Sequence, residues 1–211
     1  YLGLARNSVL KNRIESSLSS SKRNGSTGSR LITGNNSLIE KTESYLSNLF
    51  GQDTATIFNS GYMANLAFFS SVPQRGDTII YDELSHACIK DGCRLSQANR
   101  FSFKHNDLND LKIKLNKTVG MVYIVIESVY SMDGDLAPIQ AICELAKKHQ
   151  ALVVVDEAHS TGIWGNEGAG LISHLGLQDE VSAVIYTFGK AMGIHGACIT
   201  GSSSLKDYLI N

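Results

Sequence analysis

The sequence lacks the charge bias and the long apolar run that would indicate a polyanionic or membrane partner. Its 19 basic and 20 acidic residues give a formal net charge of −1, which leaves no excess positive charge to attract nucleic acid or an anionic membrane surface. No apolar run approaches the length of a membrane span, and the first residues lack the charged and apolar regions of a signal peptide. We therefore expect a cytoplasmic protein that binds small molecules or other proteins, with no nucleic acid and no membrane among its partners.

Cysteine and proline are also scarce. Four cysteines are too few and too irregularly spaced for a disulfide framework, so we expect them to be reduced and buried. Two of them lie near His86, but a fourth ligand and a paired C-x-x-C motif are missing, and we expect no metal site. Pro73 and Pro138 both fall in connections and mark no domain boundary. The cysteines are Cys88, Cys93, Cys143 and Cys198.

The composition supplies enough apolar material for a large core. Of the 211 residues, 43% are hydrophobic and 18% are charged, which is typical of one large globular domain rather than a disordered chain. The chain begins at Tyr1 rather than Met and ends at Asn211, soon after an apolar run at 197–200. We therefore expect a fragment of a longer protein.

Short apolar runs alternate with helical patterns over most of the chain. This alternation predicts an α/β fold with a mostly parallel sheet, in which ligands bind beyond the carboxyl ends of the strands. The predicted strands are 55–58, 78–81, 122–126, 151–155, 181–186 and 197–200. The predicted helices between them are 62–71, 85–98, 108–115 and 139–149.

The N-terminal part divides into a loop and a helix. Residues 16–34 are rich in Ser, Gly and Arg, a composition typical of a flexible linker, although the context also fits a functional loop. Residues 37–50 place apolar side chains on one stripe that ends at Gly51, which predicts an amphipathic helix packed on the core. We therefore divide the chain into an N-terminal segment with a glycine-rich loop, 1–36, and a large domain, 37–211. The stripe consists of Leu38, Ile39, Thr42, Tyr45, Leu46, Leu49 and Phe50.

Three side chains suited to one kind of chemistry follow two predicted strands. Lys190 comes after the run 181–186, and Asp156 and His159 come at the end of the run 151–155. Pyridoxal phosphate (PLP) needs an amine to hold its aldehyde as a Schiff base and an anion to keep its pyridine nitrogen protonated. Lys190 and Asp156 suit these tasks, and His159 can hydrogen-bond the phenolic oxygen of the ring or transfer protons. Each residue alone also fits a solvated loop charge, and only the joint pattern predicts a PLP site.

Further candidates lie at the same predicted edge of the sheet. Gly61 and Tyr62 stand where a strand turns into a helix, so their backbone N–H groups can hold a phosphate, although an ordinary turn has the same pattern. His86 falls in the first turn of a predicted helix capped by Ser85 or Asp82. There its ring can stack on a planar ligand, or serve as a capping or core residue.

The sequence VVVDEAH at 153–159 also matches the Walker B signature of DEAH-type helicases. That function requires a phosphate loop of the form G-x-x-x-x-G-K-[ST]. Around Gly189 and Lys190, Val184 stands where the first glycine should be, and Ala191 stands where Ser or Thr should be. The near-neutral charge argues against a nucleic-acid motor in the same way.

With these motifs in order, nearly the whole chain resembles the α-oxoamine synthases, PLP-dependent transferases of fold type I. The resemblance implies a large domain whose mostly parallel central sheet is flanked by helices. It also implies a C-terminal small domain that would follow Asn211 and supply an arginine for the amino-acid carboxylate. The motifs are YLGL at 1–4, GSTGSRL at 25–31, SGY at 60–62, SHA at 85–87, SMDGD at 131–135, DEAHSTG at 156–162 and TFGKA at 187–191.

The resemblance also implies roles for individual residues. Lys190 would bind PLP covalently and remove the substrate's α-proton, and Asp156 would pair with the pyridinium nitrogen. His159 and Ser131 would contact the region of the ring oxygen. His86 would stack on the ring and help position the amino-acid substrate.

Five more positions are implied with less direct chemistry. Gly61 and Tyr62 would hold the cofactor through the turn, with Thr187 on its phosphate. Arg30 matches the edge of the glycine-rich active-site loop, which in the family faces the acyl substrate. Glu127, directly after the run 122–126, is a further candidate.

The implied activity is that of a PLP-dependent acyltransferase that condenses an amino acid with an acyl thioester and releases CO₂. Among the reactions of the family we expect the one in biotin biosynthesis, with L-alanine and a pimeloyl thioester carried by coenzyme A or by an acyl carrier protein. Family members that use glycine or serine are the alternative. We also expect a homodimer, because active sites of this family lie at a dimer interface.

One position departs from the family pattern, since Ile39 stands where relatives often carry a histidine. A non-catalytic domain that keeps the fold for dimerisation or carrier-protein binding is an alternative from a different class. The intact set of Lys190, Asp156, His159 and His86 argues against that alternative.

Overall fold

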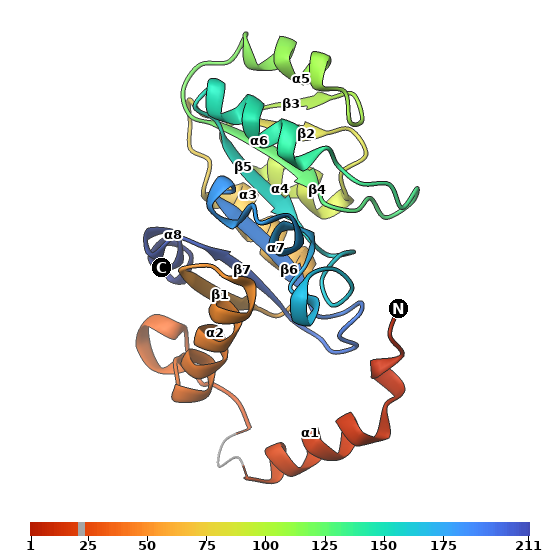
Figure 1. The fold of residues 1–211 in the computed structure, drawn as a ribbon. Coiled ribbons are helices and arrows are strands. Elements are labelled where there is room, and N and C mark those ends of the chain that lie inside the picture. Colours follow the sequence, from red (N-terminus) through yellow and green to blue (C-terminus); the bar gives the residue numbers. More distant parts are fainter. Residues whose placement is uncertain (21–23) are drawn as a thin grey trace.

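The computed structural model describes residues 1–20 and 24–211, which form a layered α/β arrangement around one seven-stranded sheet (Figure 1). The strand order is β1-β7-β6-β5-β4-β2-β3. All pairs from β6 through β5, β4 and β2 to β3 are parallel, whereas β7 is antiparallel to both β1 and β6. The expected mostly parallel sheet is therefore confirmed. The strands are β1 (Thr54–Phe58), β2 (Thr78–Asp82), β3 (Asn99–Phe103), β4 (Val122–Glu127), β5 (Leu152–Asp156), β6 (Ala183–Thr187) and β7 (Ala197–Gly201).

Helices cover both faces of this sheet. Buried side chains of α2, α5, α6 and α7 form one apolar cluster with the first face, and those of α3 and α4 form a second cluster with the other face, against which α8 packs. In Figure 1, α1 lies away from the sheet. The helices are α1 (Ser8–Ser20), α2 (Ser37–Phe50), α3 (Gly61–Ser71), α4 (Ala87–Leu95), α5 (Leu108–Leu115), α6 (Ile139–Lys148), α7 (Leu171–Leu175) and α8 (Ser203–Ile210). Short helical turns span Leu4–Arg6, Arg30–Gly34, Asn166–Gly168 and Gln178–Glu180.

Strand β4 illustrates why the central strands appear as continuous apolar runs. Every residue of β4 is buried, because helices cover both faces of the sheet. Ile124 and Ile126 point into the first cluster, and Tyr123 and Val125 point into the second. The last residue of the strand, Glu127, then lies at the edge of the sheet where the polar candidates gather.

Local sequence explains where several helices begin and end. The side chain of Asn36 accepts hydrogen bonds from the N–H groups of Leu38 and Ile39 and so caps α2. Gly51, in a left-handed conformation with φ of 65°, ends that helix. The hydroxyl of Ser60 caps α3 in the same way by accepting from Met63 N–H.

The structure corrects two of the expected segments. Residues 16–20 belong to α1, so the loop predicted at 16–34 begins later than its composition suggests; residues 21–23 lie outside the described part of the chain. The helix predicted at 85–98 ends at Leu95, and the strand β3 follows it. The sequence pattern does not predict β3, because this edge strand buries only Phe103 and alternates weakly between apolar and polar residues.

The predicted apolar stripe of α2 is also wrong at two positions. Leu38 is 69% exposed and Tyr45 is 65% exposed, while Leu46 and Phe50 pack in the core as expected. The buried face contains Glu43, which is 1% exposed and which hydrophobicity alone would place in solvent. Its ion pairs, described below, explain that burial.

All four cysteines are buried and free, as expected. Within the described part of the chain, none of the helices has the length and apolar character needed to cross a lipid bilayer.

Candidate active site

The carboxyl ends of three neighbouring parallel strands bring the main candidates together. Glu127 ends β4, and Asp156 ends β5 as its partner in the strand register. β6 ends at Thr187, and the turn that follows it carries Lys190. Parallel strands place these ends at one edge of the sheet, where ligands of such folds bind.

Lys190 and His159 form a close polar pair at this edge. Nζ of Lys190 lies 2.6 Å from Nε2 of His159. Burial lowers the pKa of Lys190, although the negative charges of Asp156 and Glu127 oppose the shift. Burial, together with the positive charges of Lys190 and His86, lowers the pKa of His159 to about 4. At neutral pH His159 is therefore an uncharged imidazole that can accept a hydrogen bond from the amine.

Asp156 is nearly fully buried, with 5% of its surface exposed. Its Oδ1 accepts a hydrogen bond of 2.8 Å from Ala158 N–H, and its Oδ2 accepts one of 2.7 Å from the side-chain amide of Asn65. Burial raises the pKa of Asp156, and these two hydrogen bonds and the charge of Lys190 oppose the rise. A carboxylate in such surroundings is stabilised by a cationic N–H group at hydrogen-bond distance.

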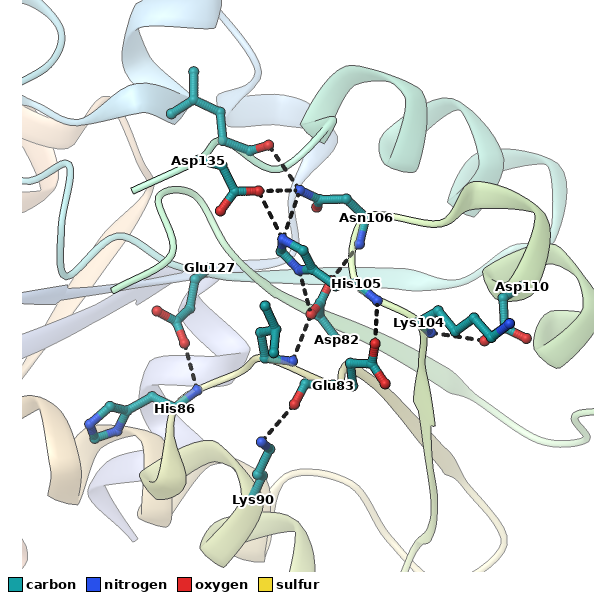
Figure 2. A network of polar contacts seen from close by, with 12 residues as sticks. Asp82, Glu83, His86, Lys90, Lys104, His105, Asn106, Asp110, Glu127 and Asp135 are labelled. Carbon is teal, nitrogen blue, oxygen red and sulfur yellow. Dashed lines mark hydrogen bonds and ion pairs between the residues drawn. The ribbon is translucent and has the colours of Figure 1, made fainter. Parts of the chain in front are cut away.

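Glu127 connects the end of β4 to the start of α4. Its Oε1 accepts a hydrogen bond of 2.5 Å from the backbone N–H of His86 (Figure 2). Burial and the charge of Asp156 raise the pKa of Glu127 to about 7. Glu127 therefore holds the backbone that carries the His86 ring.

The position of His86 differs from the expectation that it lies in the first turn of a helix capped by Ser85 or Asp82. His86 is itself the N-cap residue of α4, because its Nδ1 accepts a hydrogen bond of 3.2 Å from Cys88 N–H. Here a ring nitrogen is the capping acceptor, in place of the hydroxyl or carboxylate oxygen that usually caps a helix. The ring plane is thereby tied to the helix start.

Gly61 brings the start of α3 close to the end of β6. A Cβ atom at Gly61 would lie 3.0 Å from Oγ1 and 3.1 Å from Cβ of Thr187, so only glycine allows this approach without displacement. Gly61 and Tyr62 are the first residues of α3, where N–H groups point out of the helix without an intrahelical acceptor. A hydroxyl and free N–H groups at one point can bind a phosphate. The phenol of Tyr62 turns to another partner, Oδ2 of Asp91, at 2.5 Å.

Arg30 lies apart from this cluster. Its guanidinium group contacts the carboxylate of Glu43 through both terminal nitrogens and donates to Oδ1 of Asn35 at 3.0 Å. The same buried carboxylate accepts hydrogen bonds from Lys206 Nζ at 2.8 Å and from Ile57 N–H at 2.9 Å. Arg30 thus fixes the glycine-rich segment to α2, and none of the described contacts joins it to the strand-end cluster.

Ser131 is also outside the contacts of the cluster. It lies on an exposed turn after β4, and within the described residues its hydroxyl makes no hydrogen bond. The buried hydroxyl nearest to it in sequence is that of Ser128, which pairs with Ser160 Oγ at 2.9 Å.

Two residues that the sequence analysis gave no role contact the main candidates of the site. Asn65 binds Asp156 from the second turn of α3, and the hydroxyl of Tyr1 contacts Nδ1 of His159. The only sequence signal for Asn65 is that a polar residue interrupts an otherwise apolar helical stretch. Tyr1 stands in the YLGL motif, which assigns it no role, and its contact partner His159 lies 158 positions further along the chain.

Comparison with known proteins identifies relatives along the whole chain. The family model described as aminotransferase class I and II matches residues 1–211. An 8-amino-7-oxononanoate synthase of Lysinibacillus sphaericus is 43% identical to the chain over 213 aligned residues, which cover all of this chain and 54% of that protein. The chain thus spans about half the length of the curated relatives that it matches.

Two solved structures have a similar fold. Serine palmitoyltransferase from S. paucimobilis with a bound PLP–myriocin aldimine superposes with a TM-score of 0.91 at 33% identity, over 99% of this chain and 53% of that one. An 8-amino-7-oxononanoate synthase from Francisella tularensis superposes with a TM-score of 0.82 at 28% identity, over 100% of this chain and 58% of that one.

Proposed function

Because the chain belongs to the aminotransferase class I and II family, we propose that it is the large domain of a PLP-dependent acyltransferase. The reaction condenses L-alanine with a pimeloyl thioester, releases CO₂ and yields 8-amino-7-oxononanoate, a step of biotin biosynthesis. The observation that carries the proposal is the pairing of Lys190 with His159 beside the buried carboxylate of Asp156. The likeness to 8-amino-7-oxononanoate synthases supports the choice of substrates.

The described residues fit PLP by their chemistry. Asp156 is a buried carboxylate that a protonated ring nitrogen would neutralise, and burial makes the Lys190 amine easier to deprotonate. The close approach of Gly61 to Thr187 leaves a hydroxyl and free N–H groups for a phosphate. We assign the ring nitrogen to Asp156, the aldehyde to Lys190 and the phosphate to Gly61, Tyr62 and Thr187.

When bound, PLP supplies an electron sink for the electron pair that remains after the α-proton of the amino acid is removed. Lys190 Nζ removes and returns that proton at the α-carbon. His159 Nε2, uncharged at neutral pH and 2.6 Å away, can accept a hydrogen bond from Lys190 and so hold its Nζ in place. Asp156 keeps the ring nitrogen protonated, which the electron sink requires.

The other candidate residues orient the ligands. His86, held by Glu127 and by its own cap of α4, would lie against the ring and position the amino acid. Ser131 would reach the ring-oxygen region from its exposed turn. Arg30 would act on the acyl substrate through the glycine-rich segment that it anchors to Glu43. The homodimer remains a prediction of the resemblance, and the cytoplasmic location remains a prediction from the sequence.

A second candidate function is another reaction of the α-oxoamine synthases. The likeness to serine palmitoyltransferase structures favours this alternative, which also includes 2-amino-3-ketobutyrate CoA ligase and 5-aminolevulinate synthase. Steady-state rates of the full-length protein with alanine, glycine and serine separate these activities. A clear preference for glycine or serine would overturn the first choice. Pimeloyl-CoA and pimeloyl-carrier-protein are then compared as acyl donors.

The cofactor assignment has a direct chemical test. The protein is incubated with PLP and reduced with borohydride, and the pyridoxyl adduct is located by peptide mass spectrometry. We expect one adduct, on Lys190, and none in a Lys190→Ala variant; exposed Lys11→Ala serves as the matched control. Labelling that is scattered over surface lysines contradicts the assignment. Full activity of Lys190→Ala would instead mean that Lys190 has no catalytic role.

A further inference from the structure

His105 is held between two carboxylates that belong to none of the assignments above (Figure 2). Its Nδ1 lies 3.0 Å from Oδ1 of Asp82, and its Nε2 lies 2.8 Å from Oδ2 of Asp135. An imidazole donates hydrogen bonds from both nitrogens only when both carry protons. The two carboxylate acceptors therefore favour the imidazolium, which also gives the fully buried Asp82 a positive partner. Asn106 Nδ2 lies 3.3 Å from the same Nε2 but donates to Asp135 and Leu136.

The first carboxylate organises the turn that leads to His86. Asp82 ends β2, and its Oδ1 also accepts a hydrogen bond of 2.9 Å from Leu84 N–H. The backbone oxygen of Asp82 accepts a further hydrogen bond of 2.9 Å from Ser85 N–H. These bonds shape the two residues directly before His86, the N-cap of α4.

The second carboxylate organises the connection that carries Ser131. Asp135 lies between β4 and α6, and its backbone oxygen accepts a hydrogen bond of 3.0 Å from Tyr130 N–H, which closes the turn around Ser131. Asn106 strengthens the contact, since its Nδ2 donates to Asp135 Oδ2 at 2.8 Å and to the backbone oxygen of Leu136 at 3.2 Å. His105 and Asn106 thus bind this connection from the loop after β3 (Figure 2).

The surroundings of His105 favour its charged form. Burial opposes ionisation, but the hydrogen bonds and charges of Asp82 and Asp135 raise the pKa of His105. The backbone N–H of His105 also donates to Oε1 of Glu83 at 3.1 Å, which adds a third acidic group. The charged and titratable groups that contact His105 are Asp82 from β2, Glu83 from the turn after it, and Tyr130 and Asp135 from the β4–α6 connection.

We propose that His105 is a positioning residue whose imidazolium fixes the turn carrying His86 against the connection carrying Ser131, and so sets the affinity for the cofactor. The proposal rests on the proposed function insofar as His86 and Ser131 contact PLP. The contacts of the His105 ring with Asp82 and Asp135, here called the His105 clamp, need no cofactor. The clamp and its effect on cofactor affinity can therefore be tested separately.

The clamp is tested first on the full-length protein without PLP. A ¹⁵N NMR titration of His105 is expected to show both ring nitrogens protonated at pH 7. In a His105→Gln variant, amide hydrogen exchange of residues 129–136 is expected to accelerate about tenfold, while exchange in α6 stays unchanged. A singly protonated His105 ring at pH 7 overturns the proposal, and this result is obtained even if the variant fails to fold.

The link to the cofactor is tested by PLP affinity from pH 6 to 9. At pH 6 to 7 we expect His105→Gln to bind PLP about tenfold more weakly than the unmodified protein. The ratio of the two dissociation constants should approach one as pH rises through the pKa of His105. The titrations of Lys190 and PLP occur in both proteins, so they cancel in this ratio.

His149→Gln is the matched control, since His149 ends α6 and forms no ion pair within the described residues. Its ratio should stay near one throughout. A constant ratio for His105→Gln, whether one or ten, contradicts the positioning role, because a merely structural defect has no such pH dependence. If neither the unmodified protein nor His105→Gln binds PLP, the proposed function is refuted. The ring protonation and the amide hydrogen exchange then decide on the clamp alone.

Discussion

The side-chain amide of Asn65 donates a hydrogen bond of 2.7 Å to Oδ2 of Asp156, which lies 91 positions further along the chain. Asn65 is 1% exposed and Asp156 is 5% exposed, so water cannot readily replace this donor. We predict that Asn65→Ala lowers the free energy of unfolding by about 1–3 kcal/mol, the usual cost of leaving a buried acceptor unsatisfied. Urea denaturation of the cofactor-free protein measures this change.

The matched control for Asn65→Ala is Asn109→Ala on the exposed side of α5. It makes the same chemical change without removing a buried contact, and we expect a shift within about 0.5 kcal/mol. Equal effects of the two variants would mean that the bond to Asp156 contributes nothing to stability.

Gly61→Ala tests the phosphate cradle. The added methyl would meet Thr187 at 3.0 Å from Oγ1, so the hydroxyl and the helix start must move apart. We expect PLP affinity to fall about tenfold or more, as for other groups that position a ligand, with only a small loss of stability. Gly25→Ala is the control, because a Cβ there meets no atom within 4 Å. Unchanged PLP affinity in Gly61→Ala would remove this glycine from the site.

Glu127→Gln tests the raised pKa of the carboxyl group beside Asp156. Its folded pKa of about 7 exceeds its ordinary value of 4.5, so the folded state binds more protons than the unfolded state between these values. Stability from this group therefore falls as pH rises from about 4.5 through 7. In the cofactor-free protein, Glu127→Gln should remove on the order of 2 kcal/mol of that loss. Unfolding free energies of both proteins at pH 5 and pH 8 provide the measurement, and a parallel pH dependence would contradict the prediction.

Glu43→Gln tests a buried carboxyl group whose pKa is lowered rather than raised. Burial opposes ionisation of Glu43, but hydrogen bonds from Arg30 and Lys206 outweigh it and lower the pKa. The stability that this carboxylate contributes is present above the unfolded value of about 4.5 and is lost as pH falls through the folded pKa. At pH 7 we expect Glu43→Gln to cost about 3–5 kcal/mol, because it leaves two partly buried cations without their partner.

The control for Glu43→Gln is Glu15→Gln, which breaks the exposed pair with Lys11 on α1. Exposed pairs of this kind contribute about 0.5 kcal/mol or less. Thermal unfolding at pH 7 and pH 4 separates the two variants. A difference between them that persists undiminished at pH 4 would show that charge is not the source of the effect.

The sequence by itself determined the elements whose causes are local. The buried strands β4, β5 and β6 appear as apolar runs because both faces of each are covered, and their ends place Glu127, Asp156 and Lys190 at one edge. Asn36 and Gly51 bound α2 through their own cap geometry. Such features depend on neighbours a few residues away, so a single sequence contains them.

Only the tertiary structure decided which polar groups meet. Edge strand β3 buries a single side chain and carries no clear periodicity, yet the loop after it supplies the His105 clamp to Asp82 and Asp135. Asn65 reaches Asp156 and Arg30 turns to Glu43 because packing of the helices on the sheet brings those atoms within hydrogen-bond distance. A polar side chain has the same sequence signature whether it faces water or a buried partner, and only burial, set by the whole fold, distinguishes the two.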